Sequence, residues 1–183
     1  MDKELIKGLI AEYQQFVKSV SFVKRAVTLS DNFNYVFVGL RRVGKSYLMY
    51  QQIHHLIETG ISPEEILFFN FEDERIAGMD TEHLDMIKRC YEEMYSHRPI
   101  FFLDEIQIVP HWEQFVRRLA DQKYRVYVTG SNAKMLSKDI ATTLGGRFMI
   151  QYVYPFSFRE YLSSNGVQLD KLWICLLYTS DAA

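Results

Sequence analysis

The chain has 183 residues, 48% of them hydrophobic and 24% charged, which suffices for one α/β domain with a sizeable core. Its net charge of −2 gives no general attraction to nucleic acid or to an anionic membrane. The two cysteines, Cys90 and Cys175, exclude a disulfide framework, and no run approaches the ~18 apolar residues of a membrane span. Charged residues also interrupt any signal-peptide core near the start, so we expect a cytoplasmic protein.

The first part of the chain has the spacing of an amphipathic helix. Over residues 2–18 apolar side chains recur at helical intervals, separated by Lys3, Lys7, Glu12 and Gln15. A helix lying on a membrane surface is the alternative, but a polar face of mixed charge disfavours it. A second short apolar pattern over 20–29 predicts another helix, so residues 1–30 are expected to form a helical segment that docks on the core.

The most informative stretch follows the apolar run 35–38 and precedes the helical pattern 47–53. It matches G-x-x-x-x-G-K-[ST], in which glycines let backbone N–H groups surround a polyphosphate at a helix N-terminus. The lysine would reach the β- and γ-phosphates, and the hydroxyl of the last residue would be a Mg²⁺ ligand. The candidate nucleotide-binding residues are Gly39, Leu40, Arg41, Arg42, Val43, Gly44, Lys45, Ser46 and Tyr47.

The chain continues with alternating strand and helix signals. A capping sequence at Ser62 opens a single turn before a strand over 66–71, whose acidic exit is expected at the ligand-binding edge of the sheet. Asp80 is expected to cap a helix that runs to about Tyr95. Adjacent histidines at 54 and 55 point about 100° apart on a helix, which disfavours a zinc site.

The run Pro99–Leu103 is fully apolar and ends in Asp104 and Glu105, which is typical of a buried central strand of a parallel sheet. The carboxyl end of such a strand would lie beside the phosphate loop. Asp104 would then hold Mg²⁺ opposite Ser46, and Glu105 would act as general base toward the attacking water. An exposed strand terminus is the alternative, and the upstream phosphate loop disfavours it.

A further strand over 124–129 ends near Ser131 and Asn132. Either side chain could hydrogen-bond the γ-phosphate or the attacking water, whereas a plain turn is the competing interpretation. Residues 134–144 predict a helix that Gly145 and Gly146 end. Arg147 follows, directly before a last strand over 148–154.

In this order the motifs resemble the AAA+ ATPases, and most closely a prokaryotic branch of predicted ATPases. The resemblance covers about residues 25–162 and rests on several motifs in a fixed order. They are Gly39-Leu40-Arg41-Arg42-Val43-Gly44-Lys45-Ser46, Leu103-Asp104-Glu105-Ile106-Gln107 with Trp112, Thr129-Gly130-Ser131-Asn132, Gly146-Arg147, and Tyr154-Pro155-Phe156-Ser157-Phe158-Arg159-Glu160.

The resemblance implies a P-loop NTPase α/β fold, with a parallel five-stranded sheet in the order 5-1-4-3-2 between helices and an AAA+ core over 31–162. It implies ATP rather than GTP as the nucleotide. It also implies that Arg147 could act in trans on the nucleotide of a neighbouring copy, in a homo-oligomer. A salt bridge at a helix end is the alternative role for this arginine.

The end of the chain departs from the family. AAA+ domains normally continue into a helical lid, and the residues after the last strand do not form one. We interpret 163–174 as the truncated start of a following region, in a branch that usually carries a C-terminal domain. Residues 175–183 resemble the translation of a sequencing-library adapter, and we interpret them as an artefact.

These features predict an ATPase domain that binds ATP and Mg²⁺, hydrolyses ATP and couples the cycle to a conformational change in a partner or a C-terminal domain. A nucleotide-gated switch or scaffold with little turnover is the main alternative. A DNA-associated motor or regulator is a second one, which the near-neutral charge and the lack of a basic stripe do not support.

Overall fold

A computed structural model describes residues 2–131 and 142–166. Their centre is a five-stranded sheet in the order β2-β3-β4-β1-β5, and every pairing is parallel. This order confirms the predicted 5-1-4-3-2 topology of a P-loop NTPase α/β fold. The strands are β1 (Asn34–Val38), β2 (Ile66–Asn70), β3 (Ile100–Asp104), β4 (Val126–Gly130) and β5 (Phe148–Tyr152).

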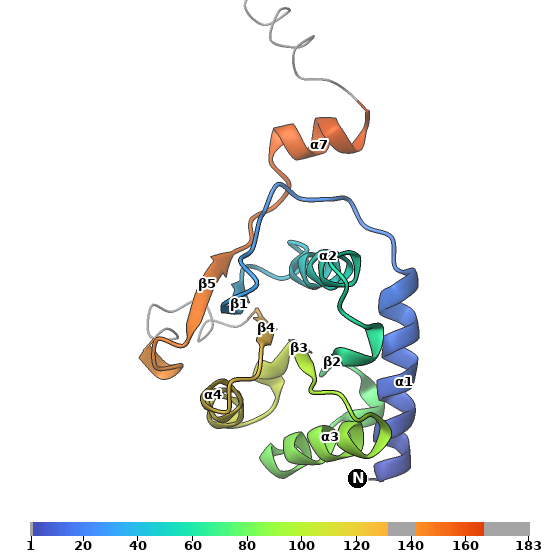
Figure 1. Ribbon diagram of the computed structural model, residues 1–183. Helices are drawn as coiled ribbons and strands as arrows, with labels where there is room; N and C mark the ends of the chain where they lie inside the picture. The colour runs from blue at the N-terminus through green and yellow to red at the C-terminus, as the bar shows by residue number, and fades with distance from the viewer. Residues whose placement is uncertain (1, 132–141, 167–183) are drawn as a thin grey trace, which may run out of the picture.

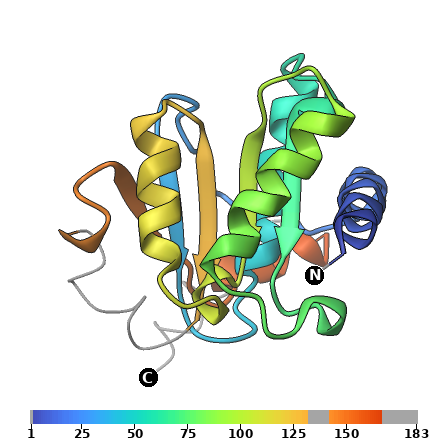
Figure 2. The same cartoon turned by 90° about the horizontal axis from the view of Figure 1, so that it is seen from below.

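Helices cover both faces of this sheet. Figure 1 shows α2 on one face, α3 and α4 on the other, and α7 standing beyond the sheet. Figure 2 shows α3 and α4 side by side across the strands, with α1 at the side of the molecule. The helices are α1 (Lys3–Ser19), α2 (Lys45–Glu58), α3 (Thr81–Met94), α4 (Trp112–Asp121) and α7 (Phe158–Ser164), with short 3-10 turns η1 (Pro63–Glu65), η2 (Glu74–Ile76) and η3 (Ile106–Ile108).

The middle of the sheet is buried on both faces. Every residue of β3 and β4 is buried, as expected for central strands of a doubly covered parallel sheet. Three aromatic rings stack across the neighbouring strands. The ring centre of Tyr127 lies 4.5 Å from that of Phe102 and 5.9 Å from that of Tyr35. This stack joins β3, β4 and β1, the strands whose carboxyl ends carry the candidate site.

Helix α1 packs on the edge strand β2. The ring of Tyr13 lies edge-on to both Phe68 and Phe69, which are neighbours in the strand and point to opposite faces. The amide of Gln14 donates to the backbone carbonyl of Ile66 at 3.0 Å. The acidic exit of β2 also anchors this helix, because Asp73 accepts a hydrogen bond from Tyr13.

The prediction of a helix over residues 20–29 is wrong. This segment is extended and crosses over α2 on its way to β1 (Figure 1). Its backbone bonds go to a side chain of that helix: Gln51 accepts from the N–H of Arg25 at 2.6 Å and donates to its carbonyl at 3.1 Å. Contact with α2 therefore overrides the local apolar spacing that predicted a helix.

Two predicted local signals are confirmed. Ser62 caps η1 and Asp80 caps α3, each in a reciprocal capping box. In the second box the partner is His83, whose ring lies 2.6 Å from the Asp80 carboxylate, so this histidine has a structural role. Among the described residues, no helix is both long and apolar enough to span a bilayer.

Candidate nucleotide-binding site

The phosphate loop lies between β1 and α2, at the carboxyl end of the central strands. At Gly39 the backbone passes so close to Val153, the residue after β5, that a Cβ atom would lie 2.3 Å from its carbonyl oxygen, so only glycine fits. Gly44, directly before α2, has φ +91°, a conformation that glycine adopts without strain. Arg42 also has a positive φ, of 65°. Gly39 and Gly44, the two glycines of the sequence motif, therefore stand where the loop needs a residue without a side chain.

Three charged side chains are nearly buried at this end of the sheet. Lys45, Asp104 and Glu105 expose 4%, 4% and 7% of their surface. The ammonium group of Lys45 lies 3.3 Å from a carboxylate oxygen of Glu105 and donates to the carbonyl of Leu40 at 3.1 Å. Buried charges are costly unless paired, so this cluster has the character of a ligand site rather than of a stabilising core.

Asp104 ends β3 inside the cluster. Its carboxylate accepts a hydrogen bond from the Thr129 hydroxyl at 2.5 Å. Burial raises the pKa of Asp104 to about 6, against the opposing effects of Thr129 and Ser46. A carboxylate and a hydroxyl are hard oxygen donors, and Mg²⁺ needs only one or two of them besides phosphate and water. Ser46 and Asp104 therefore fit a Mg²⁺ ion bound with a nucleotide.

Glu105 has an unusual backbone and many partners. Its φ is +52°, in the left-handed region that non-glycine residues rarely adopt. One carboxylate oxygen accepts hydrogen bonds from Gln107 at 2.6 Å and from Ser131 at 2.9 Å, while the other faces Lys45. Its backbone N–H donates to the Thr129 hydroxyl at 2.8 Å. Such strain at a fully held polar residue is typical of functional positions.

Of the remaining predicted residues, one joins this cluster, one lies outside the described residues and one lies at the other end of the sheet. Ser131 contacts Glu105 directly, whereas Asn132 and the predicted helix over 134–144 lie largely or wholly outside the described residues. Arg147 precedes β5, which is paired in parallel with β1, so it lies at the amino end of the sheet, away from the phosphate loop. There it forms a 2.5 Å ion pair with Asp121 at the end of α4.

A cavity of about 440 Å³ opens beside the phosphate loop. Its walls are mostly apolar and come from the extended segment before β1, the start of α2 and the segment after β5. A second hollow, of about 410 Å³, lies around Asn34 and Arg147 at the amino end of the sheet and is remote from Lys45. The lining residues of the first cavity are Val23, Arg25, Arg42, Val43, Gly44, Tyr47, Pro155 and Phe156.

Sequence reasoning did not assign roles to three residues of this region. Thr129 bridges the two acidic residues; in the sequence it belongs to the motif that ends at Asn132, and it is a polar side chain in a buried strand. Gln107 holds Glu105 from the turn that follows it. Arg25 reaches the phosphate loop from a segment that was expected to be helical.

Comparison with known proteins agrees with this geometry. A family model described as an AAA domain matches residues 31–162. The chain belongs to the AAA+ ATPases. This AAA+ chain is 32% identical over 171 residues to an uncharacterized protein of Methanocaldococcus jannaschii, a match that covers 92% of the chain and 37% of that protein. It is 34% identical over 163 residues to an uncharacterized protein of Haemophilus influenzae, covering 87% of the chain and 40% of the relative.

The AAA+ chain thus spans about two-fifths of the length of these relatives. Among solved structures it is similar to the ORC1 protein of Aeropyrum pernix in complex with DNA, with 16% identity and a TM-score of 0.46. That match covers 90% of the chain and 49% of the ORC1 chain. Membership of the AAA+ family makes this a nucleotide-binding fold of the P-loop class.

Proposed function

We propose that the chain binds ATP with Mg²⁺ at residues 39–47 and hydrolyses it, and that the nucleotide cycle drives a conformational change in a partner or in a further region of the full-length protein. The observation that carries this proposal is the convergence of Lys45, Asp104 and Glu105, all nearly buried, at the carboxyl end of the sheet. A site that only held a nucleotide would have no need for a second, strained carboxylate beside the first.

The roles follow from the contacts. Backbone N–H groups of the loop and the start of α2 would surround the phosphates. Lys45 would leave Glu105 and pair with the β- and γ-phosphates, because a polyphosphate carries more negative charge than a single carboxylate. The nucleoside would occupy the cavity beside the loop, next to Tyr47 and Phe156.

Glu105 is proposed as the general base. It would accept a proton from the water that attacks the γ-phosphorus, as the bond from that phosphorus to the β,γ-bridging oxygen breaks. Ser131 and Gln107 hold its carboxylate in place, and Ser131 would sense whether the γ-phosphate is present. Mg²⁺ held by Ser46 and Asp104 would neutralise charge on the phosphates.

Arg147 is proposed to act on a neighbouring copy. Since it lies at the opposite end of the sheet from Lys45, it cannot serve the phosphates bound in its own chain. In a homo-oligomer it could stabilise the charge on the transferring phosphoryl group of the next subunit. The Asp121 ion pair would then be the resting position of this side chain.

Binding and steady-state turnover, measured on the wild type and two variants, test the proposal. Lys45→Ala is expected to weaken ATP binding by about 100-fold or more, because the charge that meets the phosphates is lost. Glu105→Gln is expected to keep binding and to reduce turnover by about 10²- to 10⁴-fold. Glu113→Gln, a partly exposed glutamate on α4, is the matched control and should behave like the wild type. Normal turnover of Glu105→Gln would refute the assignment of the base.

A nucleotide-gated switch is the second candidate. The ion pair between Lys45 and Glu105 supports it, because each side chain is occupied by the other when no nucleotide is bound. A protein of this kind would bind ATP through Lys45 but show no turnover that Glu105→Gln could remove. The same measurements therefore separate the two functions.

A further inference from the structure

The side chain of Arg25 connects parts of the molecule that lie far apart in sequence. It extends from the segment between α1 and β1, and only 9% of its side chain is exposed. One guanidinium nitrogen donates to the carbonyl of Val43 in the phosphate loop at 3.1 Å, and another donates to the carbonyl of Tyr154 at 2.8 Å. The guanidinium also lies 5.0 Å from the centre of the Phe156 ring.

Glu160 completes this arrangement from the first turns of α7. Its two carboxylate oxygens accept from Arg25 at 3.1 and 3.3 Å, and only 12% of its side chain is exposed. The hydrogen bonds from Arg25 and Ser157 lower the pKa of Glu160 to about 2, so both partners are charged at neutral pH. A two-point contact of this kind is among the more directional charge interactions in proteins.

The partners of Arg25 belong to two walls of the cavity beside the phosphate loop. Pro155 and Phe156 line the cavity on one side, and Val43, Gly44 and Tyr47 line it on the other. Arg25 holds the first pair through Tyr154, Phe156 and Glu160, and the second group through Val43. Its own backbone is fixed to α2 by Gln51, so the guanidinium has a firm support.

We propose that Arg25, held by Glu160, is a positioning residue that keeps this cavity formed, so that the affinity for the nucleoside part of the ligand depends on the Arg25–Glu160 pair. Its guanidinium nitrogens already donate to Val43, Tyr154 and Glu160, so the proposed action on the ligand runs through the walls that Arg25 joins. This inference rests on the proposed function, because it requires that the phosphate loop bind a nucleoside triphosphate.

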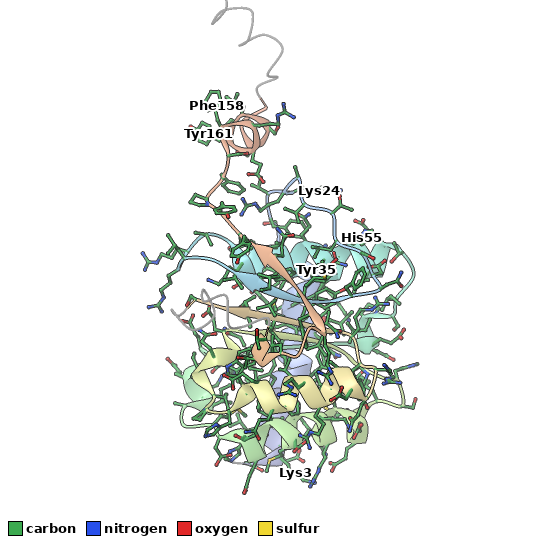
Figure 3. The ribbon with its side chains drawn as sticks, turned by 90° about the vertical axis from the view of Figure 1, so that its left-hand side faces the viewer. Lys3, Lys24, Tyr35, His55, Phe158 and Tyr161 are labelled. Carbon is green, nitrogen blue, oxygen red and sulfur yellow. The ribbon has the colours of Figure 1, made fainter. Side chains whose placement is uncertain are left out.

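A second consequence concerns α7. Figure 3 shows Phe158 and Tyr161 of this helix beyond the sheet, far from Lys3 at the other end of the molecule. Since Glu160 ties the helix to Arg25, a ligand that stabilises the cavity must also stabilise the position of α7, and the reverse holds by linkage. Nucleotide binding should therefore slow amide hydrogen exchange in 158–164, and inorganic tripolyphosphate should not.

Two ligands separate the nucleoside effect from the phosphate effect. Dissociation constants for ATP and for inorganic tripolyphosphate, both with Mg²⁺, are measured on the full chain. Arg25→Met and Glu160→Gln are expected to weaken ATP binding by about tenfold, while tripolyphosphate binding stays within about twofold of the wild type. Lys24→Met removes a neighbouring positive charge from an exposed position and should leave both constants unchanged (Figure 3).

Other results would overturn the inference. A parallel loss of ATP and tripolyphosphate affinity would mean that Arg25 supports the phosphate loop or the fold in general. Unchanged ATP affinity in Glu160→Gln would also refute the inference. This variant keeps the shape of the side chain, so it can be used if Arg25→Met does not fold. If the wild type binds both ligands and Lys45→Ala binds neither, the proposed nucleotide-binding function still stands. Either of the two results above then refutes only the role given to Arg25 and Glu160. If the wild type binds neither ligand, the proposed function fails with it.

Discussion

The two ends of the sheet use charged residues in opposite ways. At the carboxyl end Lys45, Asp104 and Glu105 are nearly buried, and Lys45 pairs with Glu105. At the amino end Arg147 and Asp121 form an ion pair with 37% and 55% of their side chains exposed. Water screens the second pair, whereas the first group keeps most of its electrostatic strength. Burial, rather than the number of charges, therefore distinguishes the end that carries the candidate site.

The largest effect is expected from Asp104→Asn, which removes a charge from the buried end. Mg²⁺-dependent turnover should fall by about 100-fold or more, because an amide is a poor substitute for a carboxylate toward Mg²⁺. The same change should stabilise the protein without ligands at pH 7. Folding raises the pKa of Asp104 from 3.8 to about 6, so stability is lost as the pH rises between these values, and the full cost of the ionised form is present at pH 7.

Thermal unfolding checks the second part of this prediction. The melting temperature of Asp104→Asn should rise by roughly 2–4 °C, equivalent to about 1 kcal/mol for a chain of this size. Asp85→Asn, at a half-exposed position on α3, serves as control and should not raise it. A fall in the melting temperature of Asp104→Asn would show that the buried carboxylate contributes to stability. It would contradict the view that the charges at the carboxyl end of the sheet cost stability.

A smaller effect is expected from Thr129→Val, which keeps the shape of the side chain but removes the hydroxyl. Asp104 then loses a donor and the N–H of Glu105 loses its acceptor, both in a fully buried place. We expect a loss of about 1–3 kcal/mol in the free energy of unfolding and about a tenfold reduction in turnover. Thr129→Ser restores the hydroxyl and should recover most of the turnover; equal turnover in both variants would contradict the bridging role.

The smallest effect on a single chain is expected from Arg147→Ala. An exposed ion pair contributes about 0–1 kcal/mol, and the residue is remote from the phosphate loop, so ATP affinity should stay within about twofold of the wild type. If Arg147 acts in trans, turnover per chain should rise with protein concentration in the wild type. This rise should disappear in Arg147→Ala. Arg118→Ala, which breaks a comparable ion pair with Asp85, should keep that rise. Weaker ATP binding by Arg147→Ala would contradict the placement of this residue away from the nucleotide of its own chain.

The sequence was sufficient for the parts of the site that are local. The phosphate loop, the strand ending in Asp104 and Glu105, and the capped helices depend on neighbouring residues, and the structure has them where the sequence placed them. The strand order came from the family resemblance, since spacing alone does not determine it.

The parts that were missed depend on long-range contacts. The segment before β1 is extended because Gln51 of α2 binds its backbone, and no local pattern reports such a partner. Arg25 and Glu160 are 135 residues apart, and either one alone resembles an ordinary surface charge. Thr129 gains its role from the two carboxyl-bearing residues of the neighbouring strand, which only the parallel pairing brings close.

The contact between α1 and β2 bears on where this protein can be divided. The family match begins at residue 31, so a chain cut at that boundary would retain every phosphate-loop residue and all five strands. It would also lose the hydrogen bond from Gln14 to the Ile66 carbonyl and the packing of Tyr13 on Phe68 and Phe69. The apolar edge strand β2 would then be exposed to solvent. Unprotected strand rims promote self-association and aggregation. We therefore expect the smallest unit able to remain monodisperse in solution to begin before α1, and to be longer than the segment that the family model matches.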